Sequence, residues 1–326
     1  MWHIKVPAST ANLGSGFDSL GMALALPLEC WFSLSEEPEF AVRGEGADVV
    51  PETAQNLVWQ TAERLHRERT GNPMPSGRLT IRSRIPLARG LGSSAAAIVA
   101  GLVLANTFLS PRLTKEELLS YATQLEGHPD NVAAAIYGGF VLAWEEGGRV
   151  RVRNYPAPEL RCLLVIPNYK VSTEDARGVL PRSVPIEDAV FNAQRLALWI
   201  DALNRRDWSL LREAGRDRLH QPYRERLVPG MQALIAGALE HGASFAGLSG
   251  SGPTVVTLVE PERADQVARV LDEIAHQYSP QGVKLHDVVP SYFGAECVLD
   301  GWQWHTGKHM GFNTRAEEHV GNADFH

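Results

Sequence analysis

Residues 86–96, PLARGLGSSAA, join the end of a strand-like segment to an alanine-rich segment through a glycine- and serine-rich turn. Gly90 and Gly92 allow positive φ angles and close approach of the backbone to a ligand. A helix that begins here would direct its unpaired amides and its dipole at an anion, and the two serine hydroxyls that follow can bind phosphate or Mg²⁺. A plain strand-to-helix turn has the same appearance. The convergence of glycines, hydroxyls and the cation Arg89 favours a phosphate site.

Regular elements must hold this turn in place, and the hydrophobic spacing indicates them on both sides. Thr114 and Glu117 form a capping box that starts one helix. The predicted elements of this half are a strand at 29–34, a helix at 56–69, a strand at 78–85 and helices at 95–108 and 114–125, followed by a loop at 128–131.

The segment 154–159, Asn-Tyr-Pro-Ala-Pro-Glu, interrupts every periodic pattern and predicts a domain boundary. The chain is therefore divided into domains at 1–155 and 156–300 and an irregular tail at 301–326. The predicted elements of the second domain are strands at 162–166, 244–248, 254–259 and 283–289 and helices at 187–205, 208–219, 229–241 and 263–278.

The composition is that of a soluble globular chain, with 44% hydrophobic, 21% charged and 8% aromatic residues among 326. Lys and Arg number 31 against 38 Asp and Glu, so no global basic field favours nucleic acid or an anionic membrane. The three cysteines form no CxxC pair, which argues against a disulfide framework or thiolate metal site. No apolar run is long enough to span a bilayer and no signal peptide is apparent, so we expect a cytoplasmic protein.

The turn matches neither the Walker pattern GxxxxGK[ST] nor the dinucleotide-binding pattern GxGxxG. It resembles the ATP-binding motif of the GHMP kinases, a family of small-molecule kinases. Two further segments, 6–18 (VPASTANLGSGFD) and 247–254 (GLSGSGPT), resemble the other motifs of that family and occur in the same order. The three motifs span most of the chain, so a chance match is improbable.

The resemblance implies an α+β fold of two domains: an N-terminal α/β nucleotide-binding domain and a C-terminal ferredoxin-like domain, with the active site in the cleft between them. It also implies ATP as the phosphoryl donor. The residues implied to bind the nucleotide are Asn56, Pro86, Leu87, Ala88, Arg89, Gly90, Leu91, Gly92, Ser93, Ser94, Ala95 and Ala96. An N-cap role for Asn56 explains its position equally well. The 247–254 segment is expected to pack beside the phosphate loop, without a catalytic part.

Within the family, segments 126–132, 172–177 and 220–224 resemble the homoserine kinases. Homoserine is a zwitterion with a side-chain hydroxyl, so its site needs a cation for the carboxylate and an oxygen for the ammonium. The residues that the resemblance implies at the substrate are Asn12, Asp18, His128, Asp130, Thr173, Arg177 and Arg224. Thr173 can equally serve as a helix cap.

The metal and the proton acceptor follow from the same resemblance. Ser94 and Glu126 are similar to the hydroxyl and carboxylate that bind Mg²⁺ in this family, and Mg²⁺ prefers such oxygen ligands. Where mevalonate kinases have a catalytic Asp, this sequence has Asn131, which cannot accept a proton. Asp130 is one candidate base, and direct transfer without a protein base is the alternative. Asp130, Asn131 and Arg177 are the expected catalytic residues.

The resemblance therefore predicts ATP-dependent phosphorylation of L-homoserine, a step towards threonine, by a homodimer without nucleic-acid or membrane partners. Two alternatives remain open from the residues. One is a kinase of the same fold that acts on another hydroxylated acceptor such as mevalonate, and the other is a catalytically silent ligand sensor.

Overall fold

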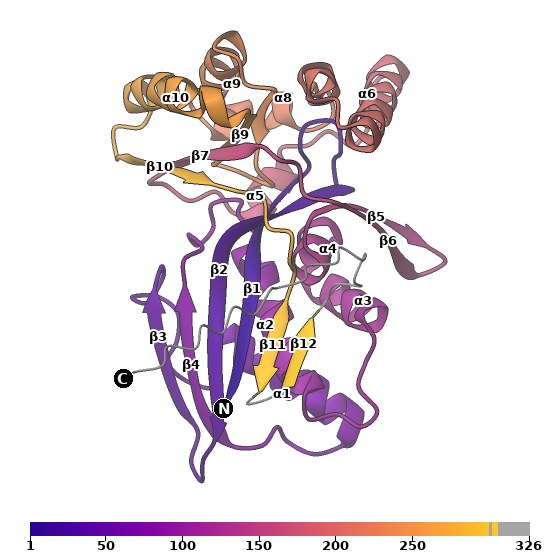
Figure 1. Ribbon diagram of the computed structural model, residues 1–326, viewed down its shortest axis with the longest axis vertical. Helices are drawn as coiled ribbons and strands as arrows, with labels where there is room; N and C mark the ends of the chain where they lie inside the picture. Colours follow the sequence, from indigo (N-terminus) through magenta and orange to yellow (C-terminus); the bar gives the residue numbers. More distant parts are fainter. Residues whose placement is uncertain (300–301, 306–326) are drawn as a thin grey trace, which may run out of the picture.

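The computed structural model describes residues 1–299 and 302–305, which form two sheets at opposite ends of the long axis (Figure 1). The strands are β1 (Trp2–Ala11), β2 (Leu20–Leu34), β3 (Glu39–Gly44), β4 (Gly77–Ser83), β5 (Phe140–Glu146), β6 (Arg149–Tyr155), β7 (Arg161–Pro167), β8 (Phe245–Leu248), β9 (Val255–Val259), β10 (Val283–Val288), β11 (Glu296–Leu299) and β12 (Trp302–His305). The helices are α1 (Leu57–Thr70), α2 (Ser93–Asn106), α3 (Lys115–Glu126), α4 (Asp130–Tyr137), α5 (Thr173–Gly178), α6 (Ile186–Arg205), α7 (Leu211–Ala214), α8 (Gln221–Arg224), α9 (Met231–Glu240) and α10 (Ala264–Tyr278), with short 3-10 turns η1 (Trp208–Leu210), η2 (Glu225–Leu227) and η3 (Pro261–Arg263).

The larger sheet, counted over the described residues, has eight strands in the order β12-β11-β1-β2-β4-β3, and β5 joins it by pairing with β2 and β6. Helices α1 to α4 cover one face of this sheet (Figure 1). The 15 residues of β2 pair with β1, with β4 and, near their beginning, with β5. This long strand makes the sheet the rigid support of the first domain.

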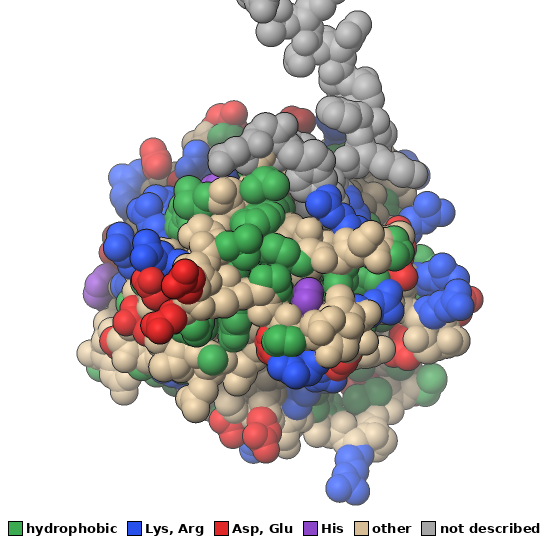
Figure 2. Space-filling view, turned by 90° about the horizontal axis from the view of Figure 1, so that it is seen from below, with side chains coloured by type: hydrophobic (Ala, Val, Ile, Leu, Met, Phe, Trp, Pro, Cys, Tyr) green, Lys and Arg blue, Asp and Glu red, His purple; other side chains and the backbone are tan. Residues whose placement is uncertain are grey.

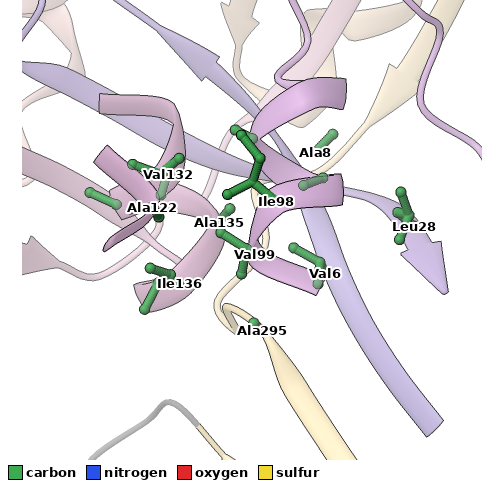
Figure 3. Close-up of a cluster of buried hydrophobic side chains, with 14 of the residues drawn as sticks. Val6, Ala8, Leu28, Ile98, Val99, Ala122, Val132, Ala135, Ile136 and Ala295 are labelled. Carbon is green, nitrogen blue, oxygen red and sulfur yellow. The ribbon is translucent and has the colours of Figure 1, made fainter. Parts of the chain in front are cut away.

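The alanine-rich helix α2 lies at the centre of the first domain, in contact with β1 and with α1, α3 and α4. Ile98 and Val99 of α2 lie between Val6 of β1 and Ala135 of α4 (Figure 3). Such a helix is apolar around its whole circumference because every side of it is buried. Close packing on all sides fixes the position of its N-terminus, which is the end that carries the glycine and serine turn.

The second sheet has the order β10-β7-β9-β8 among the described strands, and its neighbours are antiparallel. The succession β7, α9, β8, β9, α10, β10 with this strand order is the ferredoxin-like arrangement expected from the sequence. Helices α5 to α8 are inserted between β7 and α9. Trp199 of α6 stacks on Phe140 of β5, with ring centroids 5.4 Å apart, so the insertion packs against the first domain.

Most predicted elements are present, and the capping box of Thr114 and Glu117 is confirmed at the start of α3. The loop predicted at 128–131 is wrong from Asp130 onward, because this residue begins α4, an apolar helix that packs on β1 and β2. The helix predicted at 208–219 is also wrong beyond Ala214. Gly215 is the C-cap of this short helix, and it lies against the ring of Phe245, where a Cβ atom would be 2.3 Å from a ring carbon.

Strand β11 returns the chain to the first sheet after the second domain. Glu296–Leu299 pairs antiparallel with Trp2–Lys5 of β1, and β12 pairs with β11. The chain therefore passes from the second sheet to the first between β10 and β11, before the predicted boundary at residue 300. It does so because β1 offers an open edge with which β11 can pair. Residues 302–305 form a strand within the predicted irregular tail, whose other residues, 301 and 306–326, lie outside the described part.

The face seen from below in Figure 2 carries acidic and basic side chains interspersed around a hydrophobic patch. This face does not present a single-sign basic surface to a polyanion. None of the helices formed by the described residues has the length and apolar character needed to cross a bilayer.

Candidate active site

The turn before α2 has the geometry that its glycines allow. Gly90 and Gly92 have φ angles of 74° and 66°, and Ala88 also has a positive φ of 53°. Gly92 is the N-cap of α2, and because glycine has no side-chain acceptor the cap itself leaves the first-turn amides of α2 unbonded. A helix start of this kind binds anions through its amides and dipole.

The loop between β8 and β9, residues 249–254, holds the turn from the second domain. Ser249 Oγ donates to the Gly90 carbonyl at 2.6 Å, and the Gly250 amide donates to Ala11 at 3.0 Å. A Cβ atom on Gly90 would lie 2.1 Å from the Ser249 carbonyl oxygen. The expected packing of segment 247–254 beside the phosphate loop is therefore present, and it depends on a glycine at position 90.

A cavity of about 220 Å³ opens between the two sheets beside this turn. Its lining includes Asn12, Asp18, Ala88, Arg89, Gly90, Leu91, Gly92, Ser93, Ser94, Glu126, His128, Asp130, Asn131, Val171, Ser172, Thr173, Arg177, Arg224, Gly250 and Ser251. The structure thus brings together all of the residues expected at the substrate and the metal.

Some residues expected at the nucleotide lie elsewhere. Pro86 and Leu87 line a neighbouring cavity of about 170 Å³, to which Arg89 also contributes. Ala95 and Ala96 are buried inside α2. Asn56 lines neither cavity: its Oδ1 accepts from the Val58 amide at 3.0 Å, as the N-cap of α1.

Arg89 ties the turn to the second domain. Its Nε donates to the Pro167 carbonyl at the end of β7 at 2.9 Å, and Nη1 donates to the Leu87 carbonyl at 3.1 Å. Burial lowers the pKa of this guanidinium from its usual value. Arg89 therefore fixes the loop in position as well as adding a positive charge beside it.

An ion pair connects the two domains at the end of the cavity where the substrate is expected. Arg177 of α5 donates from Nη2 to Asp18 Oδ1 at 2.8 Å and from Nη1 to Oδ2 at 3.1 Å. Asp18 has a positive φ of 52°, and its amide donates to Asn12 Oδ1 at 2.9 Å. Asn12 Nδ2 in turn donates to the Gly250 carbonyl, so Asn12 shapes this turn with both ends of its amide.

Arg224 is buried, with 2% of its surface exposed, and it lies at the C-terminal end of α8. Nε donates to the Ala176 carbonyl at 3.1 Å and Nη1 to the Gly250 carbonyl at 3.1 Å. Burial and the charge of Arg177 lower the pKa of Arg224 to about 10, so the side chain remains cationic at neutral pH. A buried cation of this kind attracts a carboxylate strongly.

Ser94 and Glu126 meet at the other end of the cavity, where Ser94 Oγ donates to Glu126 Oε2 at 2.7 Å. Burial raises the pKa of the Glu126 carboxyl, and the Ser94 hydrogen bond opposes that shift. No group of three or more His, Cys, Asp or Glu that could hold a metal occurs among the residues that the structure describes. A hydroxyl and a desolvated carboxylate side by side fit a Mg²⁺ ion that completes its shell with phosphates and water.

Asp130 and Asn131 begin α4 between these two ends. Asp130 Oδ1 accepts from His128 Nδ1 at 2.9 Å and from the Asn131 amide at 2.8 Å, whereas Oδ2 accepts no hydrogen bond from a described residue. Burial lowers the pKa of His128, but the hydrogen bond and charge of Asp130 outweigh it and raise the pKa. Asn131 Oδ1 accepts from Ser9 Oγ at 2.9 Å.

Two features of the site were not expected from the sequence. Thr173 is the first residue of α5 and not its cap, because Ser172 accepts the Asp175 amide at 2.9 Å. The ring of Phe17 lies against the guanidinium groups of both arginines: its centroid is 5.9 Å from Cζ of Arg177 and 5.3 Å from Cζ of Arg224. Phe17 lies in the motif at 6–18, which was the signal available in the sequence. The residue type of a lone aromatic in a glycine-rich turn, however, does not predict which side chains it contacts.

Comparison with known proteins agrees with this architecture. Residues 56–139 match the family model described as the GHMP kinases N terminal domain, and residues 199–277 match GHMP kinases C terminal. The fold and the site thus define a GHMP-type kinase.

Individual relatives show to which family within the GHMP kinases the chain belongs. The chain is 42% identical to homoserine kinase of Carboxydothermus hydrogenoformans over 83% of its length and 88% of the relative. It is 45% identical to a homoserine kinase of Thermus thermophilus over 87% of its length and 94% of the relative. The chain belongs to the homoserine kinase family.

Solved structures show the same fold. The crystal structure of homoserine kinase from Cytophaga hutchinsonii superposes with a TM-score of 0.80 at 28% identity, covering 91% of this chain and 96% of the other. Mevalonate kinase from Methanococcus jannaschii has a TM-score of 0.66 at 15% identity over 88% of this chain and 98% of the other, a likeness of fold alone.

Proposed function

We propose that this kinase transfers the γ-phosphoryl group of ATP to the side-chain hydroxyl of L-homoserine. The observation that carries the proposal is the Asp18, Arg177 and Arg224 cluster, which faces the same cavity as the N-terminus of α2. The carboxylate and the two guanidinium groups match the ammonium and carboxylate of an amino acid. The homoserine kinase relatives support the same substrate. A homodimer and a cytoplasmic location belong to this proposal.

In the proposed reaction the phosphates of ATP lie against the first-turn amides of α2. The hydroxyl oxygen of homoserine attacks the γ-phosphorus, and the bond to the oxygen that bridges the β- and γ-phosphates breaks to release ADP. Such transfers depend mainly on alignment and charge stabilisation. Arg177 and Arg224 align the acceptor through its carboxylate, and the turn that contains Asp18 receives the ammonium.

Ser94 and Glu126 are the residues that would hold Mg²⁺. The ion would neutralise charge on the phosphates during transfer. The two side chains contribute adjacent oxygens and one negative charge that burial leaves poorly solvated. That arrangement supports a cation between the α2 turn and the end of α3.

Replacing Glu126 by Gln should raise the Mg²⁺ concentration for half-maximal activity by about tenfold to a hundredfold, because a charged ligand becomes neutral. The measurement is initial rate against free Mg²⁺ at saturating ATP. Glu145→Gln, on the exposed part of β5, is the control and should leave the Mg²⁺ dependence unchanged. An unaltered Mg²⁺ dependence in Glu126→Gln would exclude Glu126 as a ligand.

Asp130 is the proposed acceptor of the hydroxyl proton, because its Oδ2 is free of described donors while His128 and Asn131 hold Oδ1. Asp130→Asn should lower kcat by about a hundredfold or more, the usual contribution of a general base, with little change in KM for ATP. Single-turnover kinetics would measure the chemical step. A decrease of less than about tenfold would instead favour transfer of the proton directly to the phosphoryl oxygens.

The acceptor is tested by ADP release with Mg-ATP on L-homoserine, D-homoserine, L-serine, L-threonine, mevalonate and galactose. We expect turnover on L-homoserine, at least about a hundredfold above the other acceptors in kcat/KM, because among them only L-homoserine combines the carboxylate and ammonium of an L-amino acid with a hydroxyl on the γ-carbon. Turnover on mevalonate alone would contradict the ammonium site. ATP binding without turnover on any acceptor would identify a ligand sensor.

A further inference from the structure

His220 is a fully buried histidine that connects the two domains behind the substrate cavity. Its Nε2 lies 2.9 Å from the carbonyl oxygen of Gly14, which is 206 positions away in the first domain. Its Nδ1 lies 3.2 Å from Nη1 of Arg224. The imidazole therefore joins the turn that contains Asp18 to the arginine that lines the cavity.

These partners fix the protonation state of the ring. A guanidinium nitrogen only donates hydrogen bonds, so Nδ1 must be the unprotonated acceptor. A carbonyl oxygen only accepts, so Nε2 carries the hydrogen, and the Asp217 carboxylate 3.5 Å from Nε2 is a second acceptor on that side. His220 is thus neutral and protonated at Nε2, and burial, which lowers its pKa, favours the same state.

The acceptor at Nδ1 restricts the orientation of Arg224. Nε is held by the Ala176 carbonyl, and Nη1 is shared between the Gly250 carbonyl and His220. Phe17 stacks on the imidazole with centroids 5.1 Å apart and also lies against Arg224. Nη2 is the guanidinium nitrogen that remains without a partner in the described part of the chain.

We propose that His220 is a positioning residue for Arg224, and that its Nδ1 orients the guanidinium so that Nη2 is presented to the carboxylate of the substrate. This inference rests on the proposed function for the identity of that carboxylate. His220 itself touches neither substrate nor nucleotide, and it acts through the hydrogen bond to Nη1. Because its Nε2 is bonded to Gly14, the same ring also sets Arg224 relative to the Asp18 turn.

Two substitutions separate the two nitrogens of the ring. His220→Asn keeps an acceptor near the Nδ1 position but loses the donor to Gly14, whereas His220→Gln keeps a donor near Nε2 but loses the acceptor for Arg224. We expect KM for L-homoserine to rise about tenfold in His220→Gln and less than about threefold in His220→Asn, with KM for ATP unchanged in both. The thermal midpoint should fall in both, because each loses one buried bond. Equal rises in KM would overturn the proposal.

Coupling to Arg224 supplies the second readout. In the background of Arg224→Ala, adding His220→Gln should leave KM for L-homoserine unchanged, because the group that His220 orients is absent. A further rise would show that His220 acts independently of Arg224 and would contradict the proposal. His276→Gln, on the exposed face of α10, is the control and should behave as the wild type.

A test that needs no substrate distinguishes this inference from the proposed function. ¹⁵N NMR of the histidine rings should show His220, identified by the signal missing from His220→Asn, as neutral and protonated at Nε2. A ring that is cationic or protonated at Nδ1 overturns the inference whatever the acceptor. If the wild type phosphorylates a different acceptor that bears a carboxylate, the KM comparison is made with that compound. If its acceptor has no carboxylate, that result also overturns the inference about His220.

Discussion

Replacing Arg224 by Ala is expected to raise KM for L-homoserine by about a hundredfold, because a charged hydrogen bond to a carboxylate contributes roughly 1.5–3 kcal/mol. KM for ATP should change little, since Arg224 belongs to the proposed homoserine site and not to the turn before α2. Steady-state kinetics with each substrate varied in turn measure both effects. An unchanged KM for homoserine would remove Arg224 from the site.

Two further variants separate recognition from folding. Arg226→Ala, two residues along the chain at an exposed position, should leave KM for homoserine unchanged. Arg224→Ala also leaves the Ala176 and Gly250 carbonyls without their hydrogen-bond donor, so the thermal midpoint of this variant should fall as well. Arg224→Lys restores the charge without the two-pronged geometry, and its KM should lie between those of the wild type and Arg224→Ala.

Gly90→Ala is expected to lower kcat/KM for ATP by about a hundredfold or more. The added Cβ would lie 2.1 Å from the Ser249 carbonyl oxygen, a backbone atom that can move only with its loop. Displacing the phosphate loop by even about 1 Å is enough for such a loss. The unfolding free energy should fall by about 2 kcal/mol, and urea titration measures it.

Gly71→Ala is the matched control. Its φ of 75° is nearly the 74° of Gly90, but no atom of the residues that the structure describes lies within 4 Å of the Cβ position. It should cost about 1 kcal/mol of stability through backbone strain alone and leave kinetics unaltered. If both variants lose activity alike, strain at positive φ would explain the result and contact with the 249–254 loop would not.

The fold and the cavity were largely predictable because their signals are local or contiguous. The alternation at 78–85, the capping box of α3 and the succession of the 86–96 turn and α2 each lie within one short segment. The three family motifs and the segments 126–132, 172–177 and 220–224 then indicated the rest of the site, and the residues expected from them at the substrate and the metal line one cavity.

What the sequence left open depends on pairings between distant segments. β11 pairs with the edge of β1 although nearly 300 residues separate the two strands in the sequence. Strands as short as β11 show too little hydrophobic alternation to be predicted from the sequence. His220 and Gly14 meet through the packing of two domains, and no spacing rule predicts that contact. Asn56 is the opposite case: the sequence motif placed it at the nucleotide, but in the structure it forms the N-cap hydrogen bond of α1 and lines neither the site cavity nor the neighbouring one.

The pairing of β11 with β1 has a consequence for biosynthesis. A ribosome makes β1 first, and Glu296–Leu299 emerges only after the whole second domain. Until then the nascent sheet has an unpaired edge at β1, of the kind that recruits foreign strands. Completion of the N-terminal sheet is thus among the last steps of folding, and a chaperone that shields this edge during translation would protect the chain from aggregation.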